Sequence, residues 1–268
     1  MSEDPQDTEL LDLLDRRTEI GALAALKSAL RPTATATQLS QTAIAFDANV
    51  VLRLGTERRN DDIIDYLRSS HAAPLILPGQ VIQEFWNNQF AAVKSMAGTG
   101  REHFQKLKAE VEKFDTQFGD YATRFNELLD EFSTEFGYLF DPSTLTRTDA
   151  FLDVLADRAL VPFVERSVYF DVARSRDATK TPPGFRDLGD GDFYVWADLL
   201  RGLQSALAAD QSFTKVVLVS QDRKIDWSRE GTPHPILAAE VTALTGASFE
   251  IWTIDQLRSK VSEAMSLS

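Results

Sequence analysis

The chain has 268 residues, 43% of them hydrophobic and 17 of them Phe, which is enough to bury the core of one large domain and excludes a fully disordered chain. A formal net charge of −13 argues against general affinity for nucleic acid but allows a local basic groove. The absence of cysteine excludes disulfides and thiolate metal sites, and three scattered histidines argue against a zinc site.

The same composition predicts a cytoplasmic protein that does not bind membranes. No apolar run is long enough to span a bilayer, and the segment Met1 to Pro5 is acidic, unlike a signal peptide. The lack of cysteine suits a reducing compartment. The many carboxylates, without soft ligands, favour hard cations such as Mg²⁺ or Mn²⁺.

Residues 1–42 are expected to form an N-terminal helix and a linker. An amphipathic pattern predicts the helix over about 8–30, and Arg31-Pro32 ends it. The following stretch of Thr, Ala and Gln residues reads as the linker.

A strand pattern begins at residue 43. The segment 43–46 is apolar throughout, as expected of a strand buried on both faces in a parallel sheet. A charged helix is predicted next, over about 57–70. A short strand follows between Pro74 and Pro78, and a further helix opens at Gly79.

Residues 91–180 are interpreted as a helical insertion. Apolar residues recur there at steps of three and four, which predicts one long helix. These positions are Phe104, Leu107, Val111, Phe114, Phe118, Tyr121, Phe125, Leu128 and Phe132. The stripe either packs on its own domain or forms a coiled coil, as a homodimer or with a partner protein. A second helix over about 148–160 is expected to fold back on the first.

Strands and helices alternate again after the insertion. The predicted elements are helices over 192–208 and 235–245, strands over 216–220 and 249–254, and a C-terminal helix over 256–268. Such alternation is typical of a parallel sheet with helices on both faces. The expected fold class of residues 43–255 is therefore α/β, a three-layer α/β/α sandwich with a central, mainly parallel sheet, plus the long helical insertion.

Acidic residues fall where such a fold binds ligands. Asp47 and Asp222 each follow a buried strand, and open parallel sheets bind ligands at the carboxyl ends of their strands. Glu84 and Asp192 lie in the first turns of two helices, and Asp226 could add a fifth ligand. Each acid alone is also explained by a turn, a cap or the helix dipole. Four carboxylates in one pocket repel one another, so the set predicts one or two Mg²⁺ or Mn²⁺ ions.

These residues stand in segments that resemble the PIN domain superfamily of metal-dependent nucleases, especially large PIN-like domains of unknown function with a helical insertion. The segments are 46–52, 77–86, 182–187, 191–196 and 222–227. Their order and spacing resemble the family over about 43–255. The family's first motif usually has Thr or Ser where this chain has Ala48, which removes a hydroxyl but no acid.

The resemblance implies a PIN-like sandwich with endonuclease activity, usually on RNA and sometimes on structured DNA. It implies that Asp47, Glu84, Asp192 and Asp222 are the catalytic, metal-binding acids, with Asp226 as an auxiliary ligand.

Local positive charge could guide a phosphate backbone to these acids. Residues 166–186 hold five basic residues against two acidic ones and are interpreted as a loop that clamps phosphate and stacks a base. An ordinary surface loop with salt bridges explains the same stretch. The candidate substrate-binding residues are Asn49, Arg176, Lys180, Arg186, Arg223 and Lys224.

The predicted function is a metal-dependent endonuclease that hydrolyses phosphodiester bonds, of RNA rather than DNA, by metal-activated water at the four-carboxylate site. A phosphatase of the haloacid dehalogenase type also begins at a strand-end Asp, but it needs a second acid where this chain has Asn49. The other alternative is a non-catalytic PIN-like module that binds RNA or protein through the long helix. The intact acid set argues against it.

Overall fold

The computed structural model describes residues 5–31, 38–54, 60–90, 101–111, 120–136, 142–186, 189–221 and 224–266. The predictions for Asp222 and Arg223 lie outside these residues, as do those for Phe114 and Phe118. The predicted apolar side chains of Phe104, Tyr121 and Phe132 also lie outside the described part.

The centre of the described fold is a five-stranded sheet with the order β3-β2-β1-β4-β7, in which every neighbouring pair is parallel. Its strands are β1 (Thr42–Phe46), β2 (Leu75–Ile76), β3 (Ala159–Leu160), β4 (Lys215–Val219) and β7 (Ser248–Trp252). β5 (Ser228–Arg229) and β6 (Thr232–Pro233) form a separate antiparallel pair. Because Phe46 pairs with Val219, the residues after β1 and β4 leave the sheet side by side.

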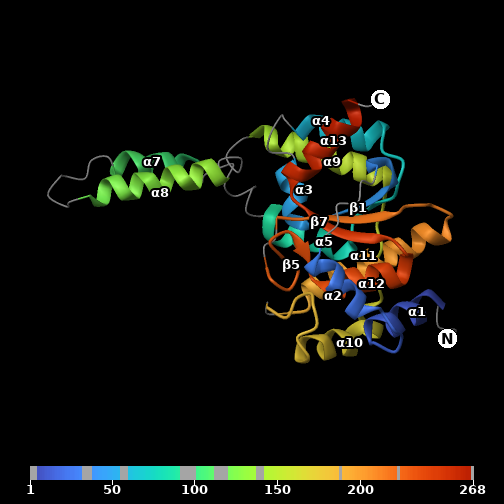
Figure 1. The fold of residues 1–268 in the computed structure, drawn as a ribbon. Helices are drawn as coiled ribbons and strands as arrows, with labels where there is room; N and C mark the ends of the chain where they lie inside the picture. The colour runs from blue at the N-terminus through green and yellow to red at the C-terminus, as the bar shows by residue number, and fades with distance from the viewer. Residues whose placement is uncertain are drawn as a thin grey trace.

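Helices cover both faces of this sheet, which confirms the predicted three-layer α/β/α arrangement (Figure 1). One layer holds α3 (Ala48–Leu54), α4 (Asp61–Ser69), α9 (Pro142–Arg158) and α13 (Ile254–Ser266). The other holds α11 (Gly191–Ala208) and α12 (Pro235–Thr245), with α1 (Pro5–Leu14), α2 (Ala22–Leu30) and α10 (Arg166–Ala178) outside them. The short α5 (Gly79–Glu84) contacts both α11 and α3. A π-helical turn, η3 (Phe85–Phe90), continues it.

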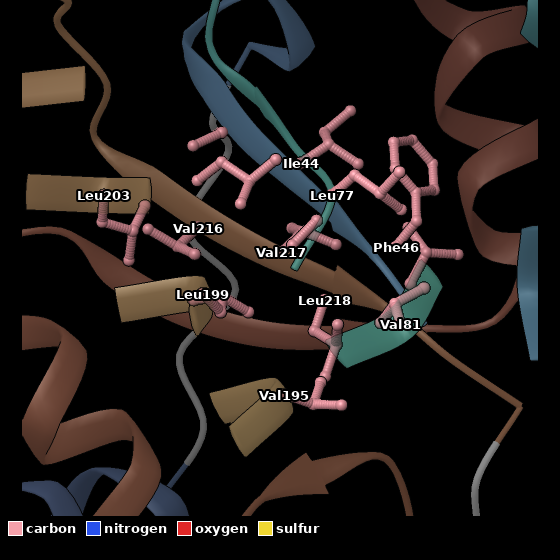
Figure 2. Packing of buried hydrophobic residues seen from close by; sticks show 14 of the residues in the cluster. Ile44, Phe46, Leu77, Val81, Val195, Leu199, Leu203, Val216, Val217 and Leu218 are labelled. Atoms are coloured by element: carbon pink, nitrogen blue, oxygen red, sulfur yellow. The ribbon is translucent and has the colours of Figure 1, made fainter. Parts of the chain in front are cut away.

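The sheet is buried because its central strands carry almost only apolar residues. Val195, Leu199 and Leu203 recur at helical spacing, so they share one face of α11 and pack toward β1 and β4 (Figure 2). Ile44 and Val217, paired across the two central strands, are both fully buried. The outcome is one continuous core that holds the carboxyl ends of the strands in a fixed relation.

The N-terminal segment differs from its prediction. The single helix expected over 8–30 is two helices, α1 and α2, and the second begins after Gly21, whose φ is +67°. A left-handed residue stops a continuous helix, and glycine adopts that conformation without steric cost. Leu10 and Leu14 of α1 are buried in the main core.

The predicted long helix over the apolar stripe is wrong. The described residues form α7 (Arg101–Val111) and α8 (Tyr121–Phe136), which pack against each other and extend away from the sheet (Figure 1). Two segments of one straight helix could not make such a contact. Val111 and Leu129 are buried, whereas Leu128 stays 59% exposed.

The end of the predicted insertion also differs. β3 joins the sheet beside β2, although 159–160 was expected at the end of a helix. The supposed loop over 166–186 is wrong for its first part, because α10 occupies Arg166–Ala178. Among the described helices, none combines the length and the apolar content that a membrane crossing requires.

Candidate active site at the carboxyl edge of the sheet

Asp47 lies directly after β1, at the start of α3. One carboxylate oxygen accepts the backbone N–H of Ala48 at 2.7 Å. The other accepts the Asn49 side-chain amide at 2.7 Å and the Ser220 hydroxyl at 2.6 Å. Asn49 in turn accepts the backbone N–H of Gln221 at 3.0 Å. Asp47 is therefore a fixed carboxylate, and Asn49 joins the loop after β1 to the loop after β4.

Glu84 ends α5, and its environment shows which acids lie near it. Burial raises the pKa of the Glu84 carboxyl, and the negative charges of Asp47 and Asp192 raise it further. A hydrogen bond from Gln80 and the positive charge of Lys224 lower that pKa in part. The structure therefore brings three of the four predicted acids within electrostatic reach of one another.

Gly191 explains how Glu84 can approach α11. A Cβ atom at position 191 would lie 2.8 Å from Oε1 of Glu84, too close for any side chain without displacing the carboxylate. Gly191 is the first residue of α11, and Asp192 follows it. The absence of a side chain at 191 therefore allows the two acids to lie at one helix start.

Asp192 is held by side chains from the segment after β4. Its Oδ2 accepts the Lys224 ammonium at 3.1 Å and the indole N–H of Trp227 at 3.1 Å. Both bonds span more than thirty residues of sequence. Lys224, predicted to bind substrate, lies at the acids and lowers the repulsion between them.

Asp226 is fully buried and bonds to backbone. Its Oδ2 accepts the N–H of Gly184 at 3.0 Å. A Cβ at Gly184 would lie 3.1 Å from the Cβ of Asp192, so the Gly184 backbone rests against that residue. Asp226 therefore holds the Gly184 backbone, and this backbone in turn packs against Asp192. Its Oδ1 has no hydrogen-bond partner among the described residues.

The described residues hold no group of three or more His, Cys, Asp or Glu side chains arranged to bind a metal ion. Asp222, the predicted fourth acid, lies outside them. In sequence it stands between Gln221, which bonds to Asn49, and Lys224, which bonds to Asp192. Its role as a ligand, like that of the other acids, stays a prediction.

Arg176 does not face a substrate. It is 3% exposed and its guanidinium pairs with Glu240 of α12 at 2.7 Å, while Arg16 pairs with the same carboxylate. It also donates to the carbonyl of Pro182 and so fixes the chain just before Gly184. The prediction that Arg176 binds substrate is therefore corrected, because a buried ion pair occupies its guanidinium.

The other predicted basic contacts fall into two groups. Lys180 and Arg186 are both exposed beyond α10, and Lys180 sits in a turn with φ of +54°. Arg223 lies outside the described residues. Lys180 and Arg186 are therefore accessible to a phosphate backbone, but no described contact links them to the acids.

A second buried acid orients the helix that carries Glu84. Asp198 of α11 accepts the backbone N–H of Gln80 at 2.8 Å and both outer nitrogens of Arg166, at 2.8 and 3.0 Å. Arg166 also donates to the Gln80 side chain at 3.3 Å, and Gln80 donates to Glu84. Asp198 is thus paired with Arg166, and it positions α5.

Several positioning residues have little or no signal in the sequence. Gln80 stands four residues before Glu84, a spacing that could have predicted their contact on one helix. Ser220 and Trp227 reach Asp47 and Asp192 only through the tertiary fold. The sequence around Gly191 predicts a helix start, but it does not predict that Glu84 packs against the Cα of this residue.

Comparison with known proteins identifies part of this arrangement. Residues 165–238 match the family model described as a PIN-like domain. This match covers α10, α11, β4 and the β5–β6 pair, and therefore Asp192 and the segment that holds it. Searches of the curated proteins and of the solved structures find no match.

Proposed function

We propose that this PIN-like domain protein is a metal-dependent endonuclease that hydrolyses phosphodiester bonds, with RNA as its preferred substrate. The resemblance to the PIN domain superfamily implies a nuclease-type module. Asp47, Glu84 and Asp192 form the carboxylate site together with Asp222, and Mg²⁺ or Mn²⁺ is the proposed cofactor.

The observation that carries the proposal is the convergence of Asp47, Glu84 and Asp192 from three separate segments. Each is held by hydrogen bonds, and burial, together with the charges of Asp47 and Asp192, raises the pKa of Glu84. Burying like charges together opposes folding, so a cation that neutralises them is the simplest physical reason for the arrangement.

The donor set fits a hard divalent cation, because it offers carboxylate oxygens and no thiolate or imidazole. A cation held there would supply Lewis-acid stabilisation and an activated water. The chain's own residues fix the geometry: Asn49 and Ser220 orient Asp47, Gln80 orients Glu84, and Trp227 orients Asp192. Lys224 stands where it can also meet the charge of a phosphate.

The test is cleavage of labelled single-stranded and structured RNA and DNA with Mn²⁺ or Mg²⁺. We expect Asp192→Asn to reduce the rate more than about 100-fold, beyond the 10- to 100-fold loss typical of groups that only orient ligands. Asp171→Asn, which changes an exposed acid of α10, should leave the rate unchanged. EDTA should abolish cleavage by the unaltered protein.

Two outcomes would refute the proposal. One is a protein that cuts neither RNA nor DNA with either metal. The other is an Asp192→Asn variant that cuts as fast as the Asp171→Asn control. Binding of nucleic acid without any cleavage would favour the non-catalytic PIN-like module instead.

A further inference from the structure

Phe163 is an exposed aromatic residue held in one place at the carboxyl edge of the sheet. It is 59% exposed, and it follows β3 by three residues, as Gly79 follows β2. Because β3, β2 and β1 are successive parallel strands of the sheet, both residues lie at the edge where Asp47 leaves it. Exposure alone would mean little, since single exposed apolar residues are common on protein surfaces.

The backbone on both sides of Phe163 is fixed by hydrogen bonds. The carbonyl of Pro162 accepts the N–H of Gly79 at 2.9 Å. The N–H of Val164 donates to the buried carboxylate of Asp198 at 2.8 Å, and the Val164 side chain is itself buried. The loop that carries Phe163 is therefore rigid at the residues before and after it.

The ring is fixed as well. Three of its carbons lie 2.3–2.4 Å from the place where a Cβ of residue 79 would be, so only glycine leaves room for it. The guanidinium of Arg166 lies 6.0 Å from the ring centroid. Arg166 is itself anchored by Asp198 and stays one-third exposed. An aromatic face kept open to solvent and already ordered costs little conformational entropy when a planar group stacks on it.

The position of the ring links it to the acids. Gln80, the neighbour of Gly79, donates to Glu84, and Arg166 donates to Gln80. Phe163, Arg166 and Glu84 are thus connected through one short helix. A strand whose phosphate lies at the carboxylates could place a neighbouring base over this ring.

We propose that Phe163 is a base-stacking platform for an unpaired nucleotide of single-stranded nucleic acid. This rests on the proposed function, because it takes the carboxylates as the site of the scissile phosphate. Stacking needs only the flat face of a base, so the platform accepts RNA and DNA and does not accept a base that is paired inside a duplex.

Binding is measured by fluorescence anisotropy with labelled ten-nucleotide strands of uridine or thymidine, and with a duplex of mixed sequence. An Asp47→Asn background prevents cleavage during the measurement. In that background we expect Phe163→Ala to weaken single-strand binding about 5- to 150-fold, the effect of losing one stacked base. Phe163→Trp should keep or strengthen it, and duplex binding should not change.

The matched control is Phe170→Ala. Phe170 is 45% exposed and has the guanidinium of Arg174 5.0 Å from its ring centroid, but it lies in α10, which packs against α1 (Figure 1). It should bind single strands like the unchanged background. Equal binding by the Phe163→Ala and Phe170→Ala variants would overturn the platform, as would a background protein that binds no single strand.

The outcomes for platform and nuclease are separable. Cleavage by the native protein together with unaltered binding in the Phe163→Ala variant refutes the platform alone. Loss of binding in that variant without any cleavage by the native protein refutes the nuclease alone. If Phe163→Ala instead changes the mass of the protein in light scattering and leaves strand binding intact, the ring contacts protein and the platform is refuted.

Discussion

Glu240 and Glu84 are both carboxylates inside the molecule, and they face opposite kinds of neighbour. Glu240 is fully buried and meets the guanidinium groups of Arg16 and Arg176 and the indole N–H of Trp196. Glu84 meets the amide of Gln80 and the charges of Asp47 and Asp192. A buried acid with paired cations is explained by the fold alone, whereas half-buried acids grouped together point to a ligand or a reaction.

The largest expected effect comes from breaking the Glu240 cluster. Glu240→Gln keeps the side-chain shape but leaves the buried charge of Arg176 without its counter-ion. We expect the free energy of unfolding to fall by about 3–5 kcal/mol, measured by urea denaturation at pH 7.

Asp65→Asn is the control for that measurement. Asp65 also pairs with an arginine, Arg68, at 3.1 Å, but both side chains are more than half exposed. An exposed pair contributes at most about 1 kcal/mol. If the two variants lose the same stability, the buried Glu240 cluster stabilises the fold no more than an exposed ion pair does.

A smaller effect is expected from His71, whose imidazole is buried and stays neutral in the folded protein. Burial lowers the pKa of His71 to about 4, and the charge of Arg158 adds to this. Between about pH 6.5 and pH 4, His71 is therefore protonated in the unfolded chain but neutral in the folded one. The free energy of unfolding falls as the pH falls through that range. The loss should reach about 3 kcal/mol at pH 4.

Denaturant midpoints of the His71→Phe variant, measured from pH 7 to pH 4, test this expectation. This variant should show a shallower acid-side loss than the native protein. His103→Gln, which changes an exposed histidine of α7, should keep the native slope. A His71→Phe profile parallel to the native one would show that other groups control the acid limb.

The carboxyl edge of the sheet could be predicted because its central strands have a distinctive sequence pattern. Uninterrupted apolar runs such as 43–46 belong to buried parallel strands, and that places Asp47 at the ligand-binding edge. A strand buried on both faces must be apolar at nearly every position, so its sequence pattern is easy to recognise. Two predicted helix starts add Glu84 and Asp192 to this edge. Asp192 does lie in the first turn of α11, whereas Glu84 is the last residue of the short α5.

The basic residues could not be placed in this way. Arg176 and Arg166 look alike in sequence, and only the tertiary fold shows that the partners Glu240 and Asp198 are buried. Charge on a helix face is compatible with solvent, with substrate or with an ion pair until the facing element is known. Phe163 could not be predicted for the same reason, because its ring packs against the Cα of Gly79, which lies in a different connection between strands.

The smallest expected change in stability is at Glu84, and its sign is the sharpest test of the comparison. Because the folded-state pKa of Glu84 is raised, its contribution is full below the ordinary value of 4.5 and is lost as the pH rises through the folded value. Glu84→Gln removes this loss and keeps the side-chain shape. At pH 7 the variant should therefore be at least as stable as the native protein while its cleavage is abolished.

Thermal melts with and without Mn²⁺ complete that test. The cation should raise the melting temperature of the native protein, since a ligand that binds only the folded state stabilises it. It should raise that of the Glu84→Gln variant much less. A variant that is destabilised as strongly as Glu240→Gln would mean that Glu84, too, is a structural acid, and the distinction between the two carboxylates would fail.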